Sequence, residues 1–131
     1  MTRGSVSGCR GLLLLALLVA AGDFPQARAA DTAAGEAVFA RCKICHSLAA
    51  GGHNGVGPNL HGVFGRKAGS VGNFPYSVAM RNSGVVWRDD TLAQYLHDPR
   101  SFIPGNRMAF PGIKDDAEIA ALLAYLHQAT Q

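Results

Sequence analysis

The segment CKICH, residues 42–46, places two cysteines and a histidine within five positions, and it limits more than any other feature how this chain can fold. The stretch that follows, GGHNGVGPNLHGVFGRKAGSVGNFP at residues 51–75, is too rich in glycine for long parts of it to form regular helix or strand. A chain with so little regular structure next to its cysteines needs something else to organise it, so we expect residues 42–46 to hold a bound group.

Several chemistries use two cysteines at this spacing. A structural zinc site needs four ligands, and here only His46, His53 or His61 could join the two thiolates. A thiol redox site usually follows a strand, and no strand signal precedes Cys42. A plain disulfide is a further alternative. The Cys-x-x-Cys-His pattern favours a fourth interpretation, the covalent attachment of one c-type haem. In such a site the two thiols add to the vinyl groups of the haem, and the imidazole coordinates its iron.

The spacing suits this attachment. Cys42 and Cys45 lie three residues apart on one helical turn, so both sulfurs can reach one edge of a porphyrin while His46 is carried beneath its centre. A covalently held macrocycle also supplies apolar surface to a small core and acts as a ligand that cannot leave. We therefore expect the chain without haem to fold poorly.

A haem iron with one histidine ligand has a second axial position to fill. The candidates are Met80, Met108, His53, His61, His97 and His127. Met108 is favoured because it lies in IPGNRMAFPG, where prolines and glycines can hold the backbone rigidly against a flat ring. His/Met coordination raises the reduction potential and closes the iron to oxygen and peroxide, which suits an electron carrier rather than an enzyme.

The N-terminus reads as a secretory signal. Arg3 and Arg10 precede the apolar run GLLLLALLVAA, and Ala27 and Ala29 make the small-x-small pattern of a cleavage site. We expect a signal peptide at residues 1–29 and one mature domain at residues 30–131, exported to a bacterial periplasm. Cleavage removes Cys9, three arginines and one aspartate, so the net charge falls from +3 to +1 and gives no argument for binding nucleic acid.

The remaining pattern predicts an all-α fold with much irregular loop, because no run alternates with period two. Asp31 or Thr32 can cap a helix through AAGEAVFARC, and YSVAMRNSG reads as a short helix closed by Gly84. A helix through RDDTLAQYLHDP is expected to stop before Pro99, and SFIPGNRMAFPGIK reads as an extended loop. The last helix, in DDAEIAALLAYLHQAT, has apolar residues at helical spacing.

These motifs resemble the class I c-type cytochromes, the family of mitochondrial cytochrome c and its soluble bacterial relatives. The resemblance covers roughly residues 33–130, and its motifs occur in family order: CKICH, GVGPNLHGVFGR, YSVAM, a tryptophan followed by DDTLAQYL, PGNRMAFPG and LLAYLHQAT. It implies the cytochrome c fold, in which short helices and loops surround one covalently bound haem.

The resemblance also implies roles for single residues. The carbonyl of Pro58 would accept a hydrogen bond from His46, and Tyr76, Trp87 and Asn106 would hydrogen-bond the haem propionates. Tyr95 would contact the sulfur of Met108, and Phe110 would cover the exposed haem edge. Simple core filling is the alternative for Trp87 and Tyr95. Gly35 and Phe39 match the place where the first helix crosses the last, against Leu122 and Tyr125.

The expected function is a soluble, monomeric, single-haem electron carrier between respiratory or photosynthetic redox partners. Positive residues occur near segments that would border the haem: Arg41, Lys43, Lys67, Arg81 and Arg107. Acidic residues lie in the later helices, so the resulting dipole would steer the haem edge toward acidic surfaces of membrane-bound partners, unless the charges are simply scattered. The alternatives are a peroxidase-like or gas-sensing haem protein with a displaceable methionine, and a haem subunit of a dehydrogenase.

Overall fold

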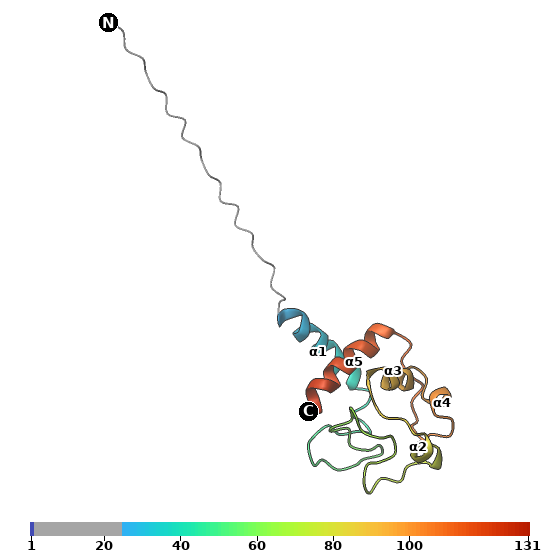
Figure 1. The fold of residues 1–131 in the computed structure, drawn as a ribbon. Coiled ribbons are helices and arrows are strands. Elements are labelled where there is room, and N and C mark those ends of the chain that lie inside the picture. Colours follow the sequence, from blue (N-terminus) through green and yellow to red (C-terminus); the bar gives the residue numbers. More distant parts are fainter. Residues whose placement is uncertain (2–24) are drawn as a thin grey trace.

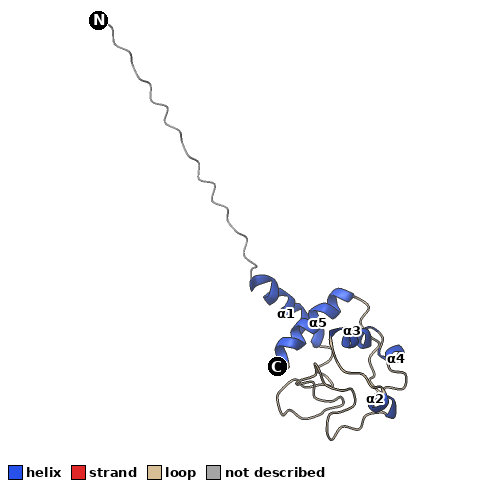
Figure 2. Cartoon of the chain, viewed as in Figure 1, coloured by secondary structure: helices blue, strands red, loops and turns tan. Residues whose placement is uncertain are grey.

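A computed structural model describes Met1 and residues 25–131, and within these residues the fold is helical (Figures 1 and 2). The helices are α1 (Pro25–Phe39), α2 (Val78–Asn82), α3 (Asp89–His97), α4 (Pro99–Phe102) and α5 (Asp116–Ala129). The described part of the chain contains no strand beyond one isolated antiparallel bridge between Lys67 and Val86. The predicted all-α class is therefore confirmed. No helix among the described residues is long and apolar enough to span a membrane.

The first helix begins earlier than predicted. It starts at Pro25, not after Asp31 or Thr32, and so runs across the expected cleavage point at Ala29. Proline suits the first position of a helix, and the alanine-rich sequence that follows continues it. The remainder of the expected signal peptide, residues 2–24, lies outside the described residues.

The helices α1 and α5 cross in the upper part of the folded region in Figure 1 and pack directly against each other. Gly35 makes this crossing possible, because a Cβ atom there would lie 2.1 Å from the carbonyl oxygen of Ala121 and 2.6 Å from the Cβ of Tyr125. The rings of Phe39 and Tyr125 pack beside it with centroids 5.5 Å apart. The predicted crossing is thus present, with Leu122 buried in the core beneath it.

The helices α2, α4 and α5 begin at side-chain caps. Ser77 accepts the N–H of Met80 at the start of α2, and Asp115 accepts the N–H of Ala117 at the start of α5. Asp98 accepts the N–H of Ser101 and opens α4, a helix that the sequence reading missed. That reading treated Pro99 only as the end of a helix, whereas Pro99 also occupies the first turn of the next one.

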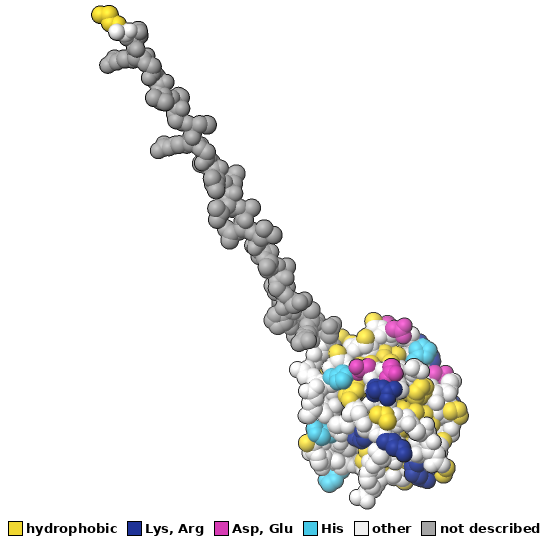
Figure 3. Space-filling view, in the orientation of Figure 1, with side chains coloured by type: hydrophobic (Ala, Val, Ile, Leu, Met, Phe, Trp, Pro, Cys, Tyr) yellow, Lys and Arg dark blue, Asp and Glu magenta, His cyan; other side chains and the backbone are white. Residues whose placement is uncertain are grey.

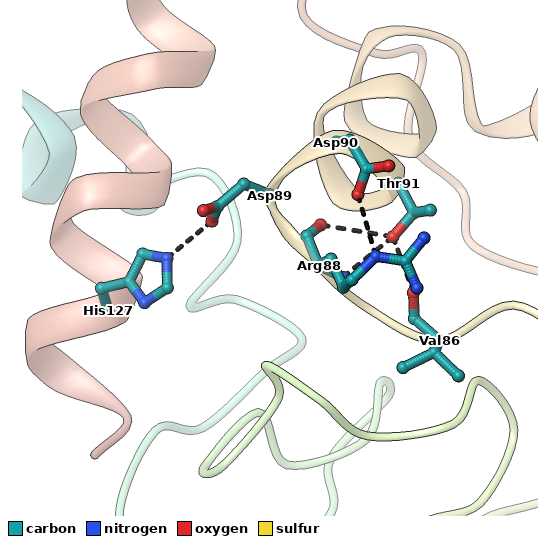
Figure 4. A network of polar contacts seen from close by, with 6 residues as sticks. All are labelled: Val86, Arg88, Asp89, Asp90, Thr91 and His127. Carbon is teal, nitrogen blue, oxygen red and sulfur yellow. Dashed lines mark hydrogen bonds and ion pairs between the residues drawn. The ribbon is translucent and has the colours of Figure 1, made fainter.

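The C-terminal half of α5 is tied to α3 and to the glycine-rich loop. Figure 4 shows His127 of α5 facing Asp89 at the start of α3, with Nε2 2.6 Å from Oδ1. The His127 ring also stacks on Phe64, with centroids 3.6 Å apart and planes inclined by 8°. These contacts occupy the His127 side chain, one of the candidate second ligands, at the protein surface.

Candidate functional site

The CKICH segment directly continues α1 as a hydrogen-bonded turn. The carbonyl oxygen of Phe39 accepts the N–H groups of Cys42 and Lys43 at 2.7 and 3.0 Å. The carbonyl oxygen of Cys42 then accepts the N–H groups of Cys45 and His46, both at 3.0 Å. Both cysteines are free thiols and partly buried. The turn therefore holds Cys42, Cys45 and His46 within one rigid unit anchored to the helix crossing.

The imidazole of His46 is fixed by the loop that follows. Its Nδ1 lies 2.7 Å from the carbonyl oxygen of Pro58, the hydrogen bond that the family resemblance implies. A carbonyl only accepts, so Nδ1 carries the proton and Nε2 keeps its lone pair. The bond thus fixes both the tautomer and the ring orientation, which leaves Nε2 available to a metal.

Gly57 shapes the space around this imidazole. A Cβ atom on Gly57 would lie 2.4 Å from Cε1, 2.7 Å from Nδ1 and 2.8 Å from Nε2 of His46. The loop is also bonded to the attachment turn, because the N–H of Gly57 donates to the carbonyl oxygen of Cys45 at 2.9 Å. The ring therefore lies flat against a backbone with no side chain. The sequence reading did not single out Gly57, although it lies directly before Pro58.

Burial changes the protonation of two of these groups. Burial raises the pKa of the Cys42 thiol, and this effect exceeds the opposing influence of Arg41. Burial also lowers the pKa of His46, against the effect of its bond to Pro58 and with a further contribution from the positive charge of Arg66. The imidazole is therefore held neutral, the form that can donate its lone pair to a metal.

Met108 lies partly buried on the loop between α4 and α5, packed against the hydrophobic core. Its N–H donates to Oδ1 of Asn106 at 2.9 Å. The other candidate sulfur, on Met80, is buried within α2. His53 and His97 are exposed, and His127 is occupied by its contacts with Asp89 and Phe64.

Tyr95 and Asn106 contact each other. The hydroxyl of Tyr95 donates to Oδ1 of Asn106 at 3.3 Å, and the amide nitrogen of Asn106 donates to the carbonyl oxygens of Pro99 and Ile103 at 2.6 and 2.9 Å. The resemblance had placed a propionate against Asn106 and the sulfur of Met108 against Tyr95. In the structure the Asn106 amide bonds within the loop, because α4 brings two carbonyl oxygens within its reach.

The other predicted residues surround the core. Trp87 is buried and packs against Tyr95, with ring centroids 5.0 Å apart. Tyr76 and Phe110 are partly buried and pack against the same core. Burial raises the pKa of the Tyr76 hydroxyl, so this group stays protonated and able to donate a hydrogen bond. The Tyr76 hydroxyl can therefore donate a hydrogen bond to an acidic group that lies beside it.

Arg66 is a half-buried cation that the sequence reading overlooked. Its Nη1 and Nη2 donate to the carbonyl oxygens of His61 and Asn59 at 2.9 and 3.1 Å. Burial lowers its pKa, and electrostatic interaction with Tyr76 raises it. A buried cation is stabilised by a nearby carboxylate. The sequence did contain an indication of this site, namely an arginine within the glycine-rich stretch GVFGRKAG. A long charged side chain in such a loop has few neighbouring side chains to pack against.

These residues fit a covalently attached haem. Two free thiols and a tautomer-fixed imidazole share one turn, Gly57 leaves room for the imidazole ring, and a thioether lies on a separate loop. Arg66 and Tyr76 offer a positive charge and a hydroxyl to the acidic substituents of a porphyrin. The donor set is that of a c-type haem with histidine and methionine ligands.

The chain is similar to several known proteins. The family model described as cytochrome c matches residues 32–130. Cytochrome c2 of Blastochloris viridis is 43% identical over 116 residues, which cover 88% of this chain and 91% of that protein. Cytochrome c2 iso-2 of Magnetospirillum fulvum is 52% identical over 88 residues, or 67% and 91% of the two chains. The solved structure of cytochrome cH from Methylobacterium extorquens superimposes with a TM-score of 0.70 at 44% identity, covering 75% of this chain and 98% of that one.

Proposed function

Because the chain belongs to the cytochrome c family, we propose that residues 42–46 carry one covalently bound haem c and that the protein transfers single electrons between redox partner proteins. The observation that carries the assignment of His46 is its hydrogen bond to Pro58, which leaves Nε2 unprotonated beside two free thiols. A bound haem would supply an iron that takes up and releases one electron.

The thiols of Cys42 and Cys45 hold the macrocycle by one thioether bond each. Each S–H would add across one vinyl group of the haem, which forms a carbon–sulfur bond without a net change of oxidation state. His46 would bind the iron through Nε2. Its bond to Pro58 makes the imidazole more electron-donating and prevents the ring from turning.

Met108 would provide the sulfur ligand of the iron. A thioether is a soft ligand that favours the reduced metal, so His/Met ligation raises the reduction potential. With both axial positions filled by side chains, small molecules are excluded from the metal. The site then supports electron transfer without substrate chemistry, so the protein is a carrier and not an enzyme.

Tyr76, Trp87 and Arg66 bind the propionate side of the macrocycle, and Phe110 covers its exposed edge. Arg66 is suited to this role because it is a half-buried cation in need of a negative charge. Asn106 is also assigned to the propionates and Tyr95 to the sulfur of Met108, and both side chains act on the Met108 loop through the hydrogen bonds described above.

Redox partners dock through acidic surfaces. On the face drawn in Figure 3, acidic side chains gather over the upper part, where α3 and α5 lie, and most basic side chains lie in the lower part. The basic residues proposed to border the haem are Arg41, Lys43, Lys67, Arg81 and Arg107. Such a separation of charge orients an approaching partner, so the association rate should fall as salt is added.

We also assign residues 1–29 to a signal peptide and the mature domain, residues 30–131, to the bacterial periplasm as a monomer. The helix α1 includes Ala29, so cleavage there would remove its first five residues and leave the crossing at Gly35 intact. N-terminal sequencing of the exported protein tests the site, and a mature chain beginning elsewhere than Ala30 would contradict it.

The assignment of Met108 is tested with two methionine variants of the purified haem protein. The parent and Met80→Ala should show the weak long-wavelength band of methionine-ligated ferric haem, whereas Met108→Ala should lose it. The ferrous parent should not bind carbon monoxide readily, and ferrous Met108→Ala should. A parent that lacks the band and binds carbon monoxide at once would contradict the assignment and the carrier function together.

A further inference from the structure

The loop that carries Met108 has few regular hydrogen bonds of its own. Between α4 and α5, the backbone N–H of Asn106 donates to the carbonyl oxygen of Ile103 at 3.0 Å, and the N–H of Phe110 donates to the carbonyl oxygen of Met108 at 2.9 Å. Neither bond ties Met108 to a helix. A residue that must hold a fixed position against a flat group therefore needs another anchor.

The side chain of Asn106 supplies this anchor. Its amide nitrogen donates to the carbonyl oxygens of Pro99, in α4, and Ile103, directly after α4. Its Oδ1 accepts the backbone N–H of Met108. One side chain thus connects the end of α4 to the residue that carries the thioether.

The hydrogen-bonding capacity of Asn106 is fully used. A primary amide has two N–H hydrogens and one oxygen with two lone pairs. The hydrogens go to Pro99 and Ile103, and the oxygen receives Met108 at 2.9 Å and the hydroxyl of Tyr95 at 3.3 Å. A side chain with four bonds inside the loop has its orientation set by the surrounding protein.

We propose that Asn106 is the residue that positions Met108, because it locks the backbone N–H of Met108 to the end of α4. This inference rests on the proposed ligation by Met108. Removing the side chain should leave the haem attached through Cys42, Cys45 and His46 but allow the loop to leave the iron more often. The fraction of molecules with an open sixth position, rather than global stability alone, is what Asn106 controls.

Added imidazole measures this open fraction. Imidazole can bind ferric iron only when Met108 has left, so its apparent affinity is proportional to the population of the open loop. In Asn106→Ala the loss of hydrogen bonds of ordinary strength should raise this apparent affinity about tenfold. The methionine-to-iron band should weaken in parallel.

Asn54→Ala is the matched control. Asn54 also accepts one backbone N–H, from Asn59 at 2.9 Å, and donates to one backbone carbonyl, of Gly72 at 3.1 Å. It therefore loses similar bonds in a loop that does not contain Met108. The imidazole affinity of Asn54→Ala should stay within about twofold of the parent even if its unfolding midpoint falls.

Asn106→Ser provides a partial rescue and a second variant should Asn106→Ala not mature. The serine hydroxyl can accept the N–H two residues ahead but cannot reach both carbonyl oxygens. The imidazole affinity of Asn106→Ser should lie between those of the parent and Asn106→Ala. If only the serine variant is obtained, its affinity should exceed that of the parent by less than tenfold.

The outcomes separate the two proposals. A parent without the methionine band refutes ligation by Met108 itself. A parent with the band, but with imidazole affinities of the Asn106 variants no higher than that of Asn54→Ala, refutes the positioning role alone. Both proposals are supported if the apparent imidazole affinity is similar in the parent and Asn54→Ala, higher in Asn106→Ser and highest in Asn106→Ala.

Discussion

Replacing Gly57 with alanine tests whether the backbone beside His46 must lack a side chain. The added Cβ would lie 2.4 Å from Cε1 of His46, whereas ordinary contact begins at 3.4 Å, so ring and loop must separate by about 1 Å. The ring cannot retreat freely, because its Nδ1 is bonded to Pro58 at 2.7 Å. Overpacking of this kind costs about 1–3 kcal/mol, and weakening the hydrogen bond adds roughly 1 kcal/mol.

We therefore expect Gly57→Ala to lower the free energy of unfolding by roughly 2–4 kcal/mol. The measurement is denaturant unfolding of the haem protein, followed by absorption and by circular dichroism, with equal slopes for parent and variant. Gly72→Ala is the control, because its Cβ would meet nothing within 4 Å, and Gly72 has no left-handed φ. A Gly57→Ala protein within about 0.5 kcal/mol of Gly72→Ala would refute the steric argument.

Three further predictions concern the helices. Gly35→Ala should cost about 3 kcal/mol or more in unfolding free energy, since its Cβ would meet the backbone of Ala121 at 2.1 Å, and an unchanged value would contradict the close crossing. Ser77→Ala should lower the free energy of unfolding by about 1 kcal/mol, because α2 loses its N-terminal cap. Ser77→Thr keeps a hydroxyl at this position and should retain most of the parent's stability in the same measurement. Hydrogen bonds from Ser101 hold the pKa of Asp98 below its usual value, so the carboxylate stabilises the fold above the unfolded pKa, and this contribution is lost as the pH falls through the folded value. The difference in stability between parent and Asp98→Ala should thus shrink in acid, and a difference that grows there would contradict this sign.

Local sequence signals predicted much of the fold. The apolar spacing in the last helix marked Ile119, Leu122, Leu123 and Leu126; in α5 the first, second and fourth are buried, and Leu123 is partly buried against the same core. Gly84 follows α2 with a φ of 71°, the left-handed conformation expected of a glycine that closes a helix. These features depend on residues within one or two turns of each other, so the sequence alone carries them.

The parts that the sequence reading missed depend on contacts between distant segments. Gly57 must lack a side chain because the loop folds back on the imidazole of His46, 11 positions earlier in the chain. The residues near position 57 contain no local pattern that predicts this contact. Asn106 bonds within its loop because α4 turns two carbonyl oxygens toward it, and α4 itself was not predicted. The family resemblance did not predict these bonds, since a shared motif fixes a position in the chain but not every bond of each side chain.

The crossing of α1 and α5 has a consequence for the order in which the protein assembles. The contact joins Gly35 to Ala121 and Tyr125, so the two ends of the domain must both be present before it can form. A chain delivered with its N-terminus first exposes Cys42 and Cys45 while α5 has not yet arrived, and contacts of long sequence separation form slowly. Burial raises the pKa of Cys42 in the finished fold and so reduces its reactivity as a nucleophile. The late closure of the helix pair therefore provides the interval in which the thiols are accessible and most easily modified.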